Sequence, residues 1–183
     1  MQNSLHLAGI FAALRFAAER HRDQRRKGSD ESPYVNHLIA VAEILATQGE
    51  VSDADVLIAG ILHDTIEDTE TTASDIEERF GKKVRSVVEE VSDDKKLRKE
   101  ERKRLQIEHA PHISREAKLV KLADKISNVS DVGRFPPAGW DQERRVQYLV
   151  WAENVVAGLR GVNPALERLF DETVVETRRR LGV

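Results

Sequence analysis

Apolar residues recur at helical spacing along almost the whole chain, and this pattern limits the fold more than any other feature of the sequence. Four valines, at positions 84, 87, 88 and 91, follow the i, i+3, i+4, i+7 spacing that places side chains on one face of an α-helix. Comparable patterns occupy residues 7–21, 36–49, 52–68, 74–80, 114–129, 141–156 and the residues from 164 onward. No run alternates between apolar and polar residues in the way that favours a strand. The sequence therefore predicts an all-α fold, a helical bundle.

Capping residues and helix breakers mark where the predicted helices begin and end. Pro136, Pro137 and Gly139 interrupt the chain between two helices, and residues 28–33 form a polar loop. N-caps are predicted at Asn36, Ser52, Ser114, Asp141 and Asn163, the last followed by a proline at the first helical position. No internal repeat or low-complexity linker interrupts this succession. We therefore expect one domain over residues 1–183, with its motif-bearing core at about 7–169.

Composition excludes several classes of protein. The 183 residues include no Cys, which rules out disulfide scaffolds, thiolate zinc sites and Cys nucleophiles. The longest uncharged apolar runs fall well short of the ~20 residues that a membrane-spanning helix needs. A formal net charge of −3 disfavours a globally basic nucleic-acid-binding protein. The N-terminal residues lack the basic segment and cleavage site of a secretory signal, so we expect a cytoplasmic protein with no membrane or nucleic-acid partner.

Four ionisable residues lie within six positions of the sequence LHDTIED, at 62–68. His63 and Glu67 are four positions apart, as are Asp64 and Asp68, so on a continuous helix each pair would share a face. Three carboxylates at a helix C-terminus repel one another and oppose the helix dipole, and a divalent cation would relieve both effects. The alternative is a solvated acidic turn that binds nothing.

Two further candidate metal ligands lie in other predicted helices. His37 stands near the start of one helix, and Asp124 falls among apolar residues in the middle of another. An unpaired carboxylate in that environment is costly, so Asp124 needs a cation or hydrogen-bond donors. Either residue alone is more often a structural hydrogen-bonding group. Together with His63 and Asp64 they supply two imidazoles and two carboxylates from three helices, a set that suits Mn²⁺ or Fe²⁺ and, less naturally, Zn²⁺.

The order of His37, then His63-Asp64, then Asp124 resembles the H…HD…D signature of the HD superfamily of metal-dependent phosphohydrolases. Four segments extend the match: YVNHLIAVAEIL, AGILHDTIEDT, FGKKVRSVVEEVSDDK and AKLVKLADKISNV. These segments resemble the hydrolase domain of RelA/SpoT-type alarmone enzymes. Over roughly residues 7–169, the chain is similar to the stand-alone small alarmone hydrolases of the Mesh (metazoan SpoT homologue) type.

This resemblance implies a function in alarmone turnover, the chemistry of the stringent response. Members of the family remove the 3′-pyrophosphate from the guanine nucleotides ppGpp or pppGpp with Mn²⁺, which gives GDP or GTP plus pyrophosphate. The implied metal ligands are His37, His63, Asp64 and Asp124, and the implied catalytic acid pair is Glu67 and Asp68. The implied substrate-binding residues are Arg26, Lys27, Lys99, Asn128, Arg144 and Tyr148.

Several alternatives stay open at this point. The same kind of site could hydrolyse another phosphorylated nucleotide, such as the 2′-phosphate of NADPH or a deoxynucleoside triphosphate. A catalytically inert HD module would share the fold, although all six ligand and acid-pair residues are present here. Ser127 stands where animal-type members frequently have an aromatic residue. We interpret Trp140 and Trp151 as packing residues, and the sequence does not predict an oligomeric state.

Overall fold

The structure, a computed structural model, describes residues 2–183, with side chains from residue 6 onward. Its α-helices are α1 (Gln2–Arg20), α2 (Val35–Glu43), α3 (Ala54–Leu62), α4 (Thr65–Asp68), α5 (Ala73–Phe80), α6 (Lys82–Val91), α7 (Lys99–His109), α8 (Arg115–Arg134), α9 (Gln142–Ala157) and α10 (Pro164–Leu181). A π-helical turn, η1 (Ile44–Gln48), continues α2. Within residues 2–183 no β-strand forms, and two isolated bridges join loops. The all-α prediction is confirmed.

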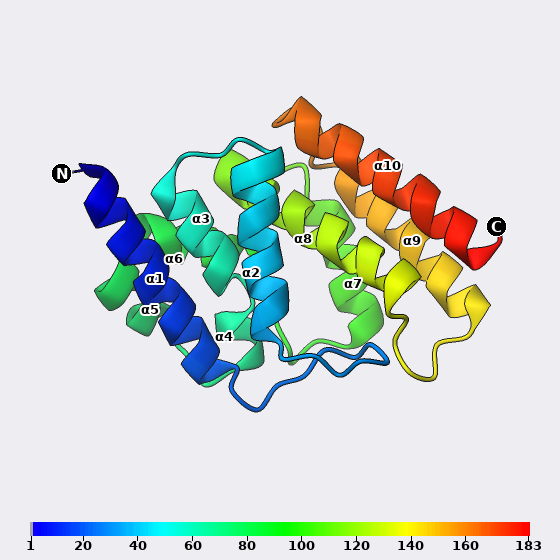
Figure 1. Cartoon of the computed structure of the whole chain (residues 1–183), viewed down its shortest axis with the longest axis horizontal. Helices are drawn as coiled ribbons and strands as arrows, with labels where there is room; N and C mark the ends of the chain where they lie inside the picture. The colour runs from blue at the N-terminus through cyan, green and yellow to red at the C-terminus, as the bar shows by residue number, and fades with distance from the viewer. Residues whose placement is uncertain (1) are drawn as a thin grey trace.

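Helix α8 runs through the middle of the molecule, between α2 on one side and α9 and α10 on the other (Figure 1). It also packs against α3 and α6. The side chains of Leu119, Leu122 and Ala123 are almost fully buried, and they belong to a core that includes residues of α1 to α3, α5, α6, α9 and α10. A helix that is surrounded in this way is apolar on most of its faces. Any charged residue on α8 therefore needs a specific partner.

The four valines at positions 84, 87, 88 and 91 form the buried face of α6, as their spacing predicts. The glycine between α5 and α6, Gly81, has φ +88°, a backbone conformation that side-chain-bearing residues rarely adopt. The chain can therefore leave one helix and enter the next without a longer loop.

Most predicted helix starts are confirmed, and two are corrected. Ser114, Asp141 and Asn163 each accept a hydrogen bond from a backbone N–H two or three residues later. Ser52 does not cap α3: Asp53 does, and its Oδ1 accepts a hydrogen bond from the N–H of Asp55 at 3.0 Å. The Asp53 carboxylate lies directly before the helix, where negative charge is also favourable. Helix α2 begins before Asn36 and has no side-chain cap.

The prediction that one helix continues through residues 62–68 is wrong. Helix α3 ends at Leu62, His63 and Asp64 form a turn, and α4 is a single short turn of helix. The backbone of Asp64, at φ −96° and ψ −1°, lies in the bridge region of the Ramachandran plot, where active-site residues are frequent. The N–H of Asp68 still donates to the carbonyl of Asp64 at 2.8 Å. The turn redirects the chain and keeps all four ionisable residues on one cleft.

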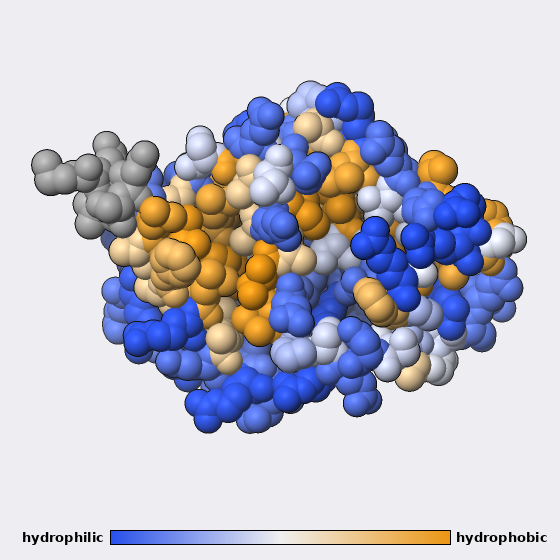
Figure 2. Space-filling view, in the orientation of Figure 1, coloured by the Kyte–Doolittle hydropathy of each residue, from blue (hydrophilic) through white to orange (hydrophobic). Residues whose placement is uncertain are grey.

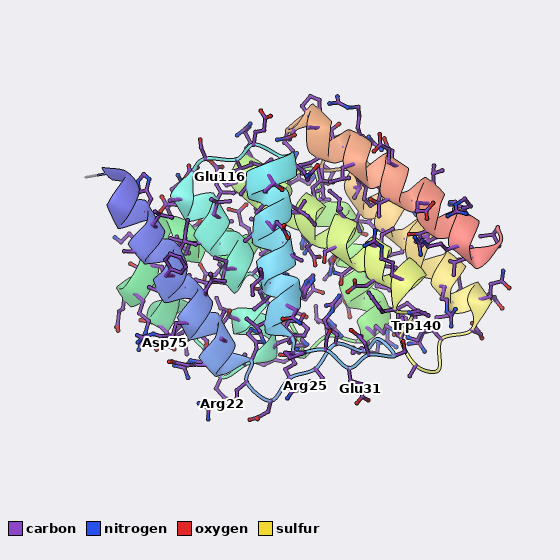
Figure 3. The ribbon with its side chains drawn as sticks, in the orientation of Figure 1. Arg22, Arg25, Glu31, Asp75, Glu116 and Trp140 are labelled. Atoms are coloured by element: carbon purple, nitrogen blue, oxygen red, sulfur yellow. The ribbon has the colours of Figure 1, made fainter. Side chains whose placement is uncertain are left out.

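Two loops meet below α2 and α8 in the view of Figure 1. Gly28, in the loop after α1, pairs with Pro137, in the loop before α9, and the N–H of Ala138 donates to the carbonyl of Lys27 at 3.1 Å. Figure 3 shows Glu31 and Trp140, one from each loop, along this edge of the molecule. Because Gly28 and Pro137 both line the cleft, the joined loops form part of its rim.

The surface over α1 and α2 differs from the lower edge of this view. Apolar side chains gather over α1 and α2, where Leu7 and Phe11 are 55% and 66% exposed and Ile39 is 45% exposed, whereas the loop after α1 is hydrophilic (Figure 2). None of the helices in residues 2–183 combines the length and the apolar composition needed to cross a membrane.

We expect the buried face of α10 to be essential for stability. Phe170→Ala removes a ring that is 1% exposed, and truncations of this kind cost about 3–5 kcal/mol of unfolding free energy. Val175→Ala, on the same helix but 67% exposed, should cost less than about 0.5 kcal/mol. Urea denaturation of both variants measures the difference. Equal costs would show that packing of α10 against α8 and α9 does not depend on this face.

Candidate active site

Three predicted metal ligands from three segments meet in one cleft. His37 lies on α2, His63 follows α3 and Asp124 lies on α8, and one ligand atom from each falls within 4.8 Å of the others. His37 Nε2 is 3.2 Å from Asp124 Oδ1, and His63 Nε2 is 3.6 Å from the same oxygen. All three side chains are buried. The structure thus brings these residues together, and their role as ligands stays a prediction.

The fourth predicted ligand, Asp64, faces the same two imidazoles. Its Oδ2 lies 3.0 Å from His63 Nε2 and 3.8 Å from His37 Nε2. The Tyr34 hydroxyl donates a hydrogen bond to this oxygen at 2.5 Å. Burial and the nearby Asp64 carboxylate raise the pKa of Tyr34, so its hydroxyl keeps the proton that it donates. Tyr34 therefore holds Asp64 toward the imidazoles.

Each imidazole is oriented by a contact at its other ring nitrogen. His63 Nδ1 donates to the carbonyl of Gly60 at 2.8 Å, and His37 Nδ1 lies 3.0 Å from the hydroxyl of Ser127. Both Nε2 atoms are buried, and neither makes a hydrogen bond of acceptable geometry. A buried imidazole that is oriented at one nitrogen, and whose other nitrogen faces carboxylates without a well-formed hydrogen bond, is the arrangement of a histidine that ligates a metal. Ser127, which stands where animal-type members frequently have an aromatic residue, thus contacts His37 directly.

The charges around the imidazoles favour a cation. Burial opposes protonation of His63, but Asp64 and Asp124 outweigh this effect and raise its pKa to about 10. Burial lowers the pKa of His37. Burial alone would raise the pKa of Asp124, yet Lys125 and the two imidazoles hold it well below the usual value. A field that attracts a proton to this point attracts a divalent ion more strongly, so the residues fit a metal ion.

The predicted acid pair lies on α4 and lines the same cleft. Glu67 Oε2 accepts a hydrogen bond from the N–H of Asp93 at 3.0 Å, and burial raises the pKa of Glu67. Asp68 accepts hydrogen bonds from Lys95 Nζ and, at 2.9 Å, from Gln24 Nε2. A carboxyl group with a raised pKa is suited to take up and release a proton. The neighbouring Asp68 is instead fixed in orientation by two side-chain donors.

All predicted substrate-binding residues line one cleft of about 1250 Å³, together with the predicted ligands and the acid pair. These residues are Arg26, Lys27, Lys99, Asn128, Arg144 and Tyr148. The lining contains ten Lys or Arg and ten Asp or Glu, whereas acids outnumber bases in the whole chain, 32 to 29. A divalent ion would make the cleft net positive, which suits an anionic substrate.

Arg26 differs from the other predicted substrate cations because its charge is already paired. Its guanidinium donates to Asp131 Oδ2 and to Asn128 Oδ1, both at 2.7 Å. Asn128 in turn donates to Asp124 Oδ1 at 2.5 Å. Arg26 therefore holds Asn128 beside a predicted metal ligand. Lys27, Lys99 and Arg144 have no carboxylate within 4.0 Å in residues 6–183, so their charges are available to a ligand.

Three aromatic rings form one wall of the cleft. The Tyr148 ring centroid lies 5.5 Å from that of Trp140 and 5.3 Å from that of Trp151. Arg144 lies 4.7 Å from the Trp140 ring centroid, and Lys103 Nζ lies 4.8 Å from that of Trp151. Such cation–π contacts stabilise charged groups beside flat apolar faces. Both tryptophans therefore contact a cation in the cleft, whereas the sequence analysis interpreted them as packing residues alone.

Several lining residues were not predicted. Tyr34 stands three positions before His37, a helical spacing that could have indicated contact with the ligand cluster. Lys121 and Lys125 flank Asp124 on α8, and Lys125 donates to Asp124 Oδ2 at 2.9 Å. Because both lysines lie among apolar residues, the sequence could have indicated that they are buried and need partners. Arg102 and Lys103, by contrast, lie in a dense run of charged residues in which none stands out.

A sequence model of the HD domain family matches residues 13–153. The chain belongs to the HD-domain family. Among relatives, the guanosine-3′,5′-bis(diphosphate) 3′-pyrophosphohydrolase MESH1 of Xenopus tropicalis is 53% identical over 167 residues, 91% of this chain and 93% of that protein. The MESH1 protein of Homo sapiens is also 53% identical, over 87% of this chain and 89% of its own length.

A solved structure supports the same placement. The structure of a metazoan ortholog of SpoT that hydrolyzes ppGpp matches with a TM-score of 0.90 and 50% identity, over 92% of this chain and 95% of that one. The bifunctional (p)ppGpp synthase/hydrolase SpoT of Escherichia coli is 33% identical over 177 residues, and the chain spans 24% of that longer protein. Within the HD-domain family, the chain thus groups with the metazoan SpoT homologues, as the resemblance in its motifs implied.

We expect His37, His63, Asp64 and Asp124 to hold one divalent ion. Asp64→Ala and His63→Ala should leave the protein folded but lower its Mn²⁺ content steeply, because each removes a ligand and its charge or lone pair. Glu70→Ala, an exposed acid that follows α4 and does not line the cleft, is the matched control and should keep wild-type metal. Elemental analysis after dialysis against Mn²⁺ measures the content. Full loading of the Asp64 and His63 variants would refute the assignment.

Proposed function

We propose that this protein is a metal-dependent guanosine-3′,5′-bis(diphosphate) 3′-pyrophosphohydrolase, that is, an alarmone hydrolase. The observation that carries the proposal is the convergence of two unpartnered imidazole nitrogens and two carboxylates beside Glu67 and Asp68 in one cleft. Relatives that are 53% identical over nearly their whole length carry this activity in their names. We take residues 1–183 as one HD-type domain that acts in the cytoplasm.

The donor set supports Mn²⁺ as the ion in this proposal. Two imidazole nitrogens and two carboxylates suit Mn²⁺ or Fe²⁺ with open water positions, and suit Zn²⁺ less well. When bound, such an ion polarises a phosphoryl oxygen and lowers the pKa of water. The chain's own contribution is to fix the ligands: Gly60 and Ser127 orient the imidazoles, and Tyr34 holds Asp64.

The reaction is a hydrolysis at the phosphorus joined to the ribose 3′-oxygen. A water oxygen forms a bond to this phosphorus, the bond to the 3′-oxygen breaks, and that oxygen keeps the electron pair and takes up a proton. In our proposal Glu67 accepts a proton from the attacking water and returns one to the leaving oxygen. Asp68, fixed by Lys95 and Gln24, orients the water. The products are pyrophosphate and GDP or GTP.

The remaining cations bind the nucleotide. Lys27, Lys99 and Arg144 have no carboxylate partner in the part of the chain that the structure describes, and Arg144 is held against the Trp140 ring. Phosphates at two ends of the nucleotide require cations apart from the metal ion, and charge-assisted contacts to phosphate are the strong kind of hydrogen bond. Tyr148 offers an aromatic face beside these charges, and Asn128, held by Arg26, offers a polar contact.

One comparison of substrates tests the proposed function. The Mn²⁺-loaded protein is assayed with ppGpp, NADPH and dGTP in a single preparation. We expect the highest kcat/KM for ppGpp, with pyrophosphate released from the 3′ position. A higher value for NADPH or dGTP would assign the site to that nucleotide instead, and no turnover of any of the three would support an inert HD module.

We expect Glu67→Gln to retain the metal ion and to lose turnover. The amide cannot exchange a proton with water, and removal of an acid–base group typically lowers the rate by ~10²–10⁴. Steady-state assays at saturating ppGpp, combined with elemental analysis, separate the two properties. Glu70→Gln should behave like the wild-type protein. Wild-type kcat in both Glu67→Gln and Asp68→Asn would show that the water is activated by another group.

We expect Lys27→Ala and Arg144→Ala to raise KM for ppGpp by about tenfold, which corresponds to ~1.4 kcal/mol. The loss should shrink as the salt concentration rises, because screening already weakens these contacts in the wild-type protein. Arg179→Ala is the control, since its side chain is 72% exposed and paired with Glu176. An equal rise in KM for all three variants would mean that only the overall charge matters.

A further inference from the structure

Lys121 is a buried lysine whose charge lacks a carboxylate partner in residues 6–183. The residue lies on α8 and is 8% exposed. Its Nζ donates a hydrogen bond to the carbonyl of Val91 at 2.9 Å, and no carboxylate oxygen of the described side chains lies within 4.0 Å of it. Removing an ammonium group from water without a countercharge costs several kcal/mol. Because Lys121 lines the cleft, an anionic ligand can supply the missing charge.

Arg102, on α7, has unused hydrogen-bonding capacity in the same cleft. One terminal nitrogen of its guanidinium lies 3.4 Å from Glu67 Oε1 and 3.9 Å from Asp93 Oδ2. Its Nε is buried and has no hydrogen-bond partner. Asp93 is itself held by Gln106 Nε2 at 2.7 Å. One terminal nitrogen of the guanidinium is thus held by two carboxylates, and the buried Nε–H remains available to a ligand.

Lys121 lies among different charges from the nucleotide-binding cations, and Arg102 lies between the two groups. The charges that act most on Lys121 are those of Lys125, Asp93, Asp124 and Glu67. Those that act most on Lys99 are Arg144, Lys27, Glu100 and Arg102, so Arg102 also lies near the nucleotide-binding cations. Val91, which accepts the Lys121 hydrogen bond, is two residues before Asp93, which donates to Glu67. Lys121 and Arg102 therefore both lie near Glu67, the proposed proton carrier, and Arg102 also borders the cations proposed for the nucleotide.

We propose that Lys121 and Arg102 bind the terminal phosphoryl group of the pyrophosphate that is released. The inference rests on the proposed function, in which the metal ion and Glu67 both act at the attacked phosphorus. The terminal phosphoryl group is the second phosphoryl group of the 3′-diphosphate, next to the attacked phosphorus. Its oxygens accept hydrogen bonds from the remaining N–H groups of both side chains. This subsite makes the protein select a nucleotide with a 3′-diphosphate over one with a 3′-monophosphate.

A purely structural role for Lys121 predicts different behaviour. If its task were only to tie the end of α6 to α8 through Val91, Lys121→Met would lower the unfolding temperature and weaken every ligand alike. If it binds phosphate, removal of a buried, unpaired charge should leave stability unchanged or increase it. The loss would then be confined to ligands that reach this subsite.

Calorimetric titration of the Mn²⁺-loaded protein with pyrophosphate tests the subsite without relying on turnover. We expect Lys121→Met and Arg102→Met to raise the Kd of pyrophosphate by about tenfold or more, and to change the Kd of a guanosine 5′-diphosphate 3′-monophosphate by less than about twofold. Thermal unfolding should show no loss of stability in Lys121→Met. Lys118→Met, on the same helix but outside the cleft lining, should match the wild-type protein in both titrations.

Two results would overturn the subsite. One is a wild-type Kd for pyrophosphate in both variants, and the other is an equal loss of affinity for pyrophosphate and for the 3′-monophosphate nucleotide. Either result would leave the proposed hydrolase function intact, because that function is decided by turnover of ppGpp in the wild-type protein. Conversely, a wild-type protein that does not hydrolyse ppGpp would refute the function, while the pyrophosphate titration would still decide whether Lys121 and Arg102 bind a diphosphate.

Discussion

A carboxylate buried in the central helix imposes much of the arrangement around it. Asp124 is 8% exposed, and a charge in that position is tolerated only with partners. Lys125 and Asn128 donate to its two oxygens, while His37 and His63 face it from two other segments. The packing of α2 and α3 against α8 therefore has two results at once: it closes the apolar core, and it surrounds a fixed negative charge with groups that can share a cation.

Local signals in the sequence were sufficient for most of the helices and for the chemistry of the site, whereas the highly charged α7 carried no such signal. The spacing of the four valines identified α6, and side-chain caps such as Ser114 and Asn163 marked where helices start, because both effects act within a few residues. The two imidazoles and two carboxylates were recognisable as a group because few other ligands could balance so much charge in apolar surroundings. All the predicted site residues line one cleft, although their individual roles stay predictions.

The sequence was less informative wherever the answer depends on which segments meet in space. The break at His63 and Asp64 follows from the need to aim both side chains at α8, and helical periodicity does not contain that requirement. Arg26 was implied as a substrate-binding residue, yet its charge is already paired with Asp131, 105 positions away in the sequence. Lys121 reads as one of several lysines on α8, and only the packing of α6 against α8 shows that it is buried and lacks a carboxylate partner.

The contacts of Arg26 connect the rim of the cleft to its metal ligands. The loop that carries Arg26 is joined to the loop before α9 through Gly28 and Pro137. From this rim, Arg26 reaches Asn128, and Asn128 reaches the same Asp124 oxygen that faces both imidazoles. Charge-assisted hydrogen bonds in series, partly buried as these are, hold one another in place more firmly than isolated ones. The position of the rim is thus coupled to the position of Asp124, so a nucleotide that contacts the rim loops and a cation held by Asp124 would each reduce the freedom of the same chain of contacts.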